Sequence, residues 1–131
     1  PEMLSKSGHS FSIDFYCLGA LLYELVTGLP PYYSTNQDIL YQSILNHPVE
    51  FPEEISLSPQ IKSLLLQLLI KDPEKRLGTT GGVTEILSHP WLSGVSMLDV
   101  LAKKLNPPIK PNLLSYNFDD VEFRSSEHQD M

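Results

Sequence analysis

The side chains that could carry chemistry are few in this sequence, and their spacing excludes several familiar kinds of site. A zinc or iron site needs closely spaced cysteine and histidine ligands, and the single Cys and the four His here are scattered. The segment GTTGGVT at 78–84 has the wrong glycine spacing for a dinucleotide fingerprint and lacks the lysine of a phosphate-binding loop. No acid pair, catalytic triad or basic nucleic-acid stripe is visible. The scattered candidates are Cys17, His9, His47, His89 and His128.

Two carboxylates stand out because they lie in an almost entirely apolar stretch. Residues 13–32 are IDFYCLGALLYELVTGLPPY, and their only charges are Asp14 near the start and Glu24 further on. A helix that is apolar on all sides is normally buried on all sides, so we expect other elements to cover this one. Taken alone, Asp14 is a capping acid, favoured by the helix dipole by ~0.3 to 1 kcal/mol, and Glu24 is a solvated helix-end residue. We expect Cys17 to be a packed small hydrophobe rather than a reactive thiol.

The bulk composition indicates a globular domain. The chain has 131 residues, 41% hydrophobic and 19% charged, which is enough for one domain with a core. A net charge of -7 argues against a nucleic-acid partner and is compatible with basic ligands. No run approaches the roughly 20 apolar residues of a membrane span, and no signal peptide opens the chain. Because the first residue is Pro1, we expect a piece of a longer protein.

Apolar periodicity predicts an all-α body followed by an extended tail. Ser12 is the expected N-cap of the first helix, with Gly28 as its stop. Ser58 is the expected cap of the third helix, with Pro59 at its first position. Trp91 is expected in the core. From residue 106 onward the chain is rich in Pro, Asn, Ser and Asp, which is typical of an extended segment. The predicted helices are 13–27, 36–46, 59–70, 83–88 and 97–105.

The order of several motifs resembles one family. The PE at residues 1 and 2, the stretch DFYCLGALLYELVTGLPPY, the loop KDPEKRLG and the segment HPWL together resemble the end of the C-terminal lobe of a eukaryotic protein kinase. The segments RLG, GGVTEILSHPWL, PPIKP and NFD resemble the AGC group of serine/threonine kinases in particular. The resemblance implies that residues 1–92 are the C-terminal part of a kinase domain, its lower helical subdomain, and that 93–131 are the AGC-type tail.

The resemblance also implies structural roles for two sets of residues. Asp14 matches the helix-start aspartate that holds the catalytic loop, while Leu21 and Leu25 match positions that support the apolar stack beneath the adenine ring. Glu2 and Arg76 match a pair that clamps the activation segment to the helical base, and such a buried pair costs ~3 to 5 kcal/mol to break. The alternative for Arg76 is one more solvated charge in KDPEKR.

Two further residues are implicated in ligand binding by the same resemblance. Glu24 matches the acid that receives a substrate arginine in kinases that prefer basic sites, a contact that a bidentate pair makes strong. Phe118 matches the tail aromatic at the edge of the nucleotide pocket, with docking elsewhere as the alternative. PPIKP is expected to be the tail segment that wraps the lobes, with a polyproline ligand for a partner domain as the alternative.

The motifs that would perform catalysis are absent from this sequence. A kinase needs a glycine-rich loop, a strand lysine, a His-Arg-Asp catalytic loop and Asp-Phe-Gly for magnesium. DFY at 14–16 lacks the glycine, and HQD at 128–130 is followed only by Met131. The kinase resemblance implies that the parent protein uses ATP and Mg²⁺. Because this chain lacks the motifs that hold them, the chain alone is expected to bind neither and to be inactive. The expected partners are protein substrates with basic Ser/Thr sites and the rest of the same kinase, and the expected location is intracellular, most simply cytoplasmic.

Two alternatives from other functional classes stay open. The chain could be a non-catalytic helical interaction module, although its apolar helix would then expose a sticky surface. The parent could also be a pseudokinase, which has the same helical base and a broken catalytic loop.

Overall fold

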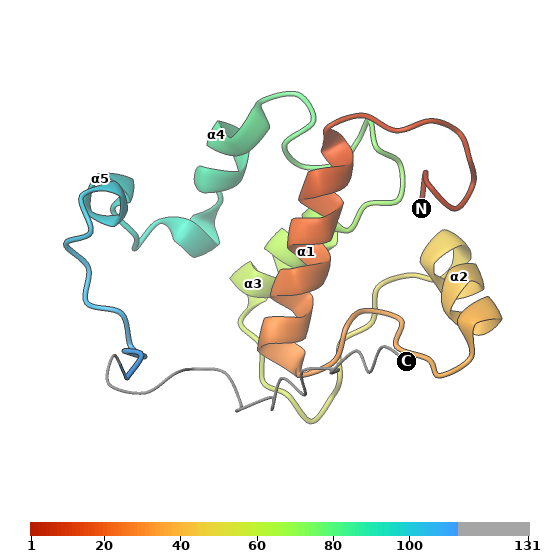
Figure 1. Ribbon diagram of the computed structural model, residues 1–131, viewed down its shortest axis with the longest axis horizontal. Coiled ribbons are helices and arrows are strands. Elements are labelled where there is room, and N and C mark those ends of the chain that lie inside the picture. The colour runs from red at the N-terminus through yellow and green to blue at the C-terminus, as the bar shows by residue number, and fades with distance from the viewer. Residues whose placement is uncertain (113–131) are drawn as a thin grey trace, which may run out of the picture. The chain divides into compact units, whose positions relative to one another are not determined.

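A computed structural model describes residues 1–112, and in that range the chain is helical with no strand (Figure 1). Residues 1–95 form one compact unit, and a second unit begins at Ser96. The predicted helical character is therefore confirmed for the described range. Phe118 and the HQD segment lie outside it. The elements are α1 Ser12–Thr27, α2 Gln37–Asn46, α3 Pro59–Leu68, α4 Gly82–Leu87, the 3-10 turn η1 Pro90–Leu92 and, in the second unit, α5 Met97–Leu101.

The α1 helix ends where its sequence stops it. Gly28 has φ of 87° and donates its N–H to the Glu24 carbonyl at 2.8 Å, a left-handed cap that glycine adopts without a steric penalty. The start of α1 differs from the prediction, because Ser12 lies inside the helix and is fully buried, and Phe11 takes the cap position without a side-chain hydrogen bond. The Ser12 carbonyl accepts a hydrogen bond from Arg76 instead.

Side-chain caps begin the next two helices, and the cap at Ser58 was predicted from the sequence. The Asn36 side chain accepts hydrogen bonds from the N–H groups of Asp38 and Ile39 at 2.9 and 3.2 Å, which starts α2. Ser58 accepts from the N–H of Ile61 at 3.3 Å and Pro59 occupies the first position of α3. Such caps supply partners to amide groups that a helix start leaves unpaired.

The core lies between α1 and α3, which run side by side (Figure 1). Gly19 makes this approach possible, since a Cβ there would stand 2.8 Å from the Cβ of Leu68. The apolar rhythm of α3 places one leucine-rich face entirely inside, where Leu65 and Leu68 are 0% exposed. The buried apolar residues are Tyr23, Ile61, Leu64, Leu65, Leu68, Leu69 and Ile86.

The apolar character of α1 on all sides predicts that other elements cover it, and within residues 1–112 one side of it is left uncovered. Gly19 and Tyr23 mark the face that packs on α3, and the opposite face is open. Cys17 lies about 160° around the helix from Gly19 at 100° per residue, so it is exposed instead of packed.

Two other sequence predictions are corrected by local geometry. Trp91 is 38% exposed instead of packed in the core. Residues three apart lie on the same side of a 3-10 turn. Here the inner side carries His89, which is buried, and Leu92, which is half-buried. The helix predicted at 97–105 ends at Leu101, since Lys103 has φ of 54°, outside the helical region.

Candidate functional site

Glu2 and Arg76 form a buried ion pair although 74 residues separate them in the sequence. Nη1 and Nη2 of Arg76 donate to the two carboxylate oxygens of Glu2 at 2.7 and 3.0 Å. The two residues are 3% and 2% exposed. The pKa of Glu2 falls to about 2, first because its carboxylate accepts these hydrogen bonds, with burial opposing the shift.

The remaining N–H groups of Arg76 bind three backbone carbonyls from two segments. Nε donates to Ile70 at 2.9 Å, Nη1 to Ser12 at 2.9 Å and Nη2 to Lys71 at 3.3 Å. The guanidinium also lies 5.0 Å from the ring centre of Tyr16. Arginine has five N–H donors in a fixed fork, and each has a partner here. One side chain thus joins the N-terminal loop, the start of α1 and the segment after α3.

A second group of predicted residues shares the open face of α1. Asp14, Leu18, Leu21 and Leu25 follow one another at spacings of four, three and four residues, which places them on one face of the helix. Leu18, Leu21 and Leu25 are 42%, 57% and 73% exposed, and Asp14 is also exposed. We call Leu18, Leu21 and Leu25 the leucine face. The structure therefore brings these residues together on one surface, apart from the Glu2–Arg76 pair.

Glu24 is exposed in the last turn of α1. It is next in sequence to Tyr23, whose hydroxyl donates to the Glu50 carbonyl at 2.8 Å. Its carboxylate is therefore free to face solvent close to the loop that follows Gly28.

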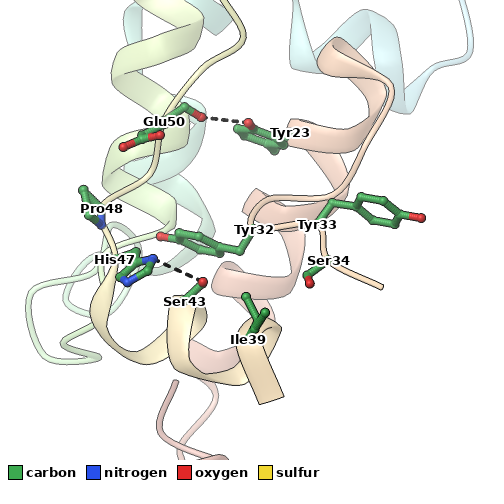
Figure 2. A pocket seen from close by; sticks show the side chains of 9 residues that line it. All are labelled: Tyr23, Tyr32, Tyr33, Ser34, Ile39, Ser43, His47, Pro48 and Glu50. Atoms are coloured by element: carbon green, nitrogen blue, oxygen red, sulfur yellow. Dashed lines mark hydrogen bonds between the residues drawn. The ribbon is translucent and has the colours of Figure 1, made fainter. Parts of the chain in front are cut away.

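A cavity that the sequence did not reveal lies beside this end of α1. It has a volume of about 570 Å³ and is lined by residues that include Tyr23, Tyr32, Tyr33, Ser43, His47 and Glu50, and we call it the tyrosine pocket. Figure 2 shows the Tyr32 ring between two hydrogen-bonded pairs of residues, while the ring of Tyr33 points away from the ring of Tyr32. The pairs are Tyr23 with Glu50 and Ser43 with His47. The only sequence signal was the TyrTyr that follows two prolines.

Tyr32 is held firmly in the wall of this pocket. Its φ is 62°, which is rare for a bulky residue, and its hydroxyl accepts from Nζ of Lys71 at 3.1 Å. Burial raises the pKa of Tyr32 to about 12 and lowers the pKa of Lys71. Lys71 also donates to the carbonyls of Ile44 and Ser43 at 2.6 and 3.4 Å, near the end of α2.

The described residues do not offer a metal site, since no three His, Cys, Asp or Glu side chains gather among residues 1–112. Within that same range no helix has the length and apolar character needed to cross a membrane.

Known proteins resemble this chain over most of its length. Residues 1–92 match the family described as protein kinase domain. The chain is 39% identical to the serine/threonine protein kinase ypkA of Aspergillus fumigatus over 99% of its own residues and 21% of that protein. It is 43% identical to the serine/threonine-protein kinase gad8 of Schizosaccharomyces pombe, over 95% of this chain and 22% of that protein. It is 42% identical to the serine/threonine-protein kinase Sgk1 of Homo sapiens, over 89% of this chain and 27% of that protein.

The chain thus spans roughly a fifth to a quarter of the length of these relatives, whose shares are 21%, 22% and 27%. The relatives are AGC-group serine/threonine kinases, so the resemblance predicted from the sequence is confirmed. Because the family match covers well over half of its residues, the chain belongs to the protein kinase domain family.

Proposed function

We propose that this chain is the C-terminal part of a serine/threonine protein kinase. Residues 1–92 are assigned to the lower helical subdomain of the C-terminal lobe, and 93–131 to an AGC-type tail. The parent transfers the γ-phosphoryl group of ATP, with Mg²⁺, to Ser or Thr hydroxyls of protein substrates, mainly by positioning and electrostatic stabilisation. The family match over 1–92 and the kinase relatives support this assignment. An intracellular, cytoplasmic location belongs to the same proposal and rests on the family alone.

The observation that carries the proposal is the buried pair of Glu2 and Arg76. A carboxylate and a guanidinium at 2.7 and 3.0 Å, with both residues nearly inaccessible, hold the N-terminal loop on the helical base. In the kinase this loop is the end of the activation segment. The pair therefore acts as the clamp that fixes this segment relative to the helices.

The leucine face supports a scaffold role for α1. Three leucines on one exposed helical face make an apolar surface of the kind that marks an interaction site. We assign this face to the catalytic loop and the apolar stack of the parent, with Leu21 and Leu25 carrying the stack. Asp14, exposed on the same face, is assigned to hydrogen bonds with amides of the catalytic loop.

Glu24 is assigned to substrate selection. Its carboxylate is exposed at the end of α1, where a substrate guanidinium can reach it. The preferred substrates then carry an arginine near the phosphorylated residue. Phe118 is assigned to the edge of the nucleotide pocket, and this assignment lies outside the described residues.

ATP and Mg²⁺ are assigned to the rest of the parent. Mg²⁺ in kinases is held by carboxylate and amide oxygens together with the phosphates, and residues 1–112 do not gather such a set of acids. This chain contributes scaffold and substrate surface, and the isolated 131-residue chain is expected to transfer no phosphate.

Phosphate transfer by the parent polypeptide tests the proposal. The parent is incubated with labelled ATP, Mg²⁺ and a serine peptide that carries either arginine or its neutral isostere citrulline. We expect transfer to the arginine peptide, and Glu24→Gln should lower its kcat/KM about fivefold, as loss of a partly exposed ion pair of ~1 kcal/mol predicts. Glu54→Gln, which removes an exposed charge elsewhere, is the matched control. Equal effects of the two substitutions would remove Glu24 from substrate selection.

The leucine face also favours a second candidate, a non-catalytic interaction module or pseudokinase. A parent that transfers no phosphate to any peptide, but binds a partner through α1, would establish that alternative. Leu25 is 73% exposed on this face, so Leu25→Asp should then abolish partner binding.

A further inference from the structure

One wall of the tyrosine pocket, Tyr32, is held by contacts within the chain. Tyr32 follows Pro30 and Pro31 and is held in the left-handed region, with its hydroxyl bonded to Nζ of Lys71 at 3.1 Å. The same ammonium lies 4.5 Å from the Tyr32 ring centre and donates to the Ile44 carbonyl. Residues in such strained conformations persist where the surroundings determine them and cluster at binding sites.

Glu50 stands at the rim of the pocket with its backbone anchored and its side chain free. Its carbonyl accepts the Tyr23 hydroxyl at 2.8 Å, as Figure 2 shows. The Tyr23 ring stacks on Phe51, the residue that follows Glu50, with ring centres 5.7 Å apart. Glu50 is exposed, so a ligand side chain that reaches this rim from solvent can meet its carboxylate.

The charge of the pocket favours a cation. Among the described residues that line it, Glu50 alone is charged when histidine is neutral. The Nδ1 of His47 is 3.2 Å from the Ser43 hydroxyl. The ammonium of Lys71 lies nearby and would repel a second cation. This ammonium already donates hydrogen bonds to the Tyr32 hydroxyl and to carbonyls in the last turn of α2. The chain as a whole carries a charge of -7.

We propose that the tyrosine pocket binds an arginine-bearing segment of the protein substrate, with Glu50 pairing its guanidinium. This inference rests on the proposed kinase function. A guanidinium is planar, stacks on aromatic faces and pairs with a carboxylate through two hydrogen bonds, and three tyrosines and one glutamate are among the residues that line this pocket. Its volume of about 570 Å³ fits the range of ~300 to 1,000 Å³ typical of ligand pockets.

Peptide binding to the intact parent polypeptide tests this inference independently of catalysis. The fluorescent peptides contain serine and one arginine at a constant position. At each remaining position in turn, one peptide carries a second arginine and a matched peptide carries citrulline. At one position arginine should bind about two- to fivefold more tightly than citrulline, the range expected of a solvent-exposed pair. Glu50→Gln should remove that difference, and because Tyr23 bonds to the Glu50 carbonyl, this substitution leaves the fold intact.

Glu54→Gln is the matched control, since Glu54 is exposed in the same segment but does not line the pocket. The difference between arginine and citrulline should survive in this variant. The inference is overturned if no position shows a difference, if the difference persists in Glu50→Gln, or if Glu54→Gln removes it equally. Phosphate transfer is measured separately. A parent that transfers none refutes the proposed function, while the binding results still decide whether the pocket takes an arginine.

Discussion

Removal of the Arg76 side chain should cost more stability than any other single change in the KDPEKR loop. In the parent protein, Arg76→Ala takes away two hydrogen bonds to Glu2 and three to backbone carbonyls. Both partners of the ion pair are at most 3% exposed, so water cannot easily replace the lost contacts. A carboxylate left buried without a partner pays its desolvation cost in full.

Two estimates of the loss agree in size. Breaking a buried ion pair by removing one partner typically costs ~3 to 5 kcal/mol. The fall of the Glu2 pKa from 4.5 to about 2 corresponds to ~3 kcal/mol, at ~1.4 kcal/mol for each unit. We therefore expect Arg76→Ala to lower the free energy of unfolding by ~3 to 5 kcal/mol at pH 7.

The same pair should make this loss depend on pH. Because the pKa of Glu2 is lower in the folded state, its contribution is fully present well above 4.5 and is lost as the pH falls toward about 2. Half or more of the glutamates in the unfolded chain are protonated at pH 4. The difference between wild type and Arg76→Ala should therefore be smaller at pH 4 than at pH 7, by ~1 kcal/mol.

Urea unfolding at the two pH values measures both effects. Lys75→Ala is the control, because Lys75 is a cation of the same loop whose side chain is 78% exposed and pairs with Asp72 at 3.3 Å. Such an exposed pair contributes ~0 to 1 kcal/mol. If Arg76→Ala cost no more than Lys75→Ala, the buried pair would not be the clamp described above.

Two further predictions concern the packing of α1 on α3, both measured as urea unfolding of the parent. Gly19→Ala should cost ~1 to 3 kcal/mol, because its new Cβ would meet Leu68 at 2.8 Å, whereas Gly94→Ala has open space around it and should cost far less. Leu65→Ala should cost ~2 to 5 kcal/mol, since Leu65 is 0% exposed, whereas Leu66→Ala, at 46% exposure, should cost less than ~1 kcal/mol. Equal losses within either pair would contradict the packing described here.

The pair of Glu2 and Arg76 illustrates what family resemblance adds to residue patterns. Neither spacing nor composition connects two residues 74 positions apart, and the motif order alone named them as partners. The geometry then places the two side chains within hydrogen-bonding distance. The tyrosine pocket had no such guide, because its walls come from α1, from the segment between α1 and α2, from α2 and from the segment after it.

The sequence by itself determined where most helices begin and end, because the signals for this are local. Asn36, Ser58 and Gly28 bond within a few residues of their own position, and those contacts form whatever else surrounds them. Only the tertiary structure decided which faces are covered. Apolar character all round α1 does not say which side is covered within this chain, and the side with Leu18, Leu21 and Leu25 is uncovered in residues 1–112, where Leu25 is 73% exposed. Burial depends on what a second segment brings to a surface, and a pattern in one segment does not contain that information.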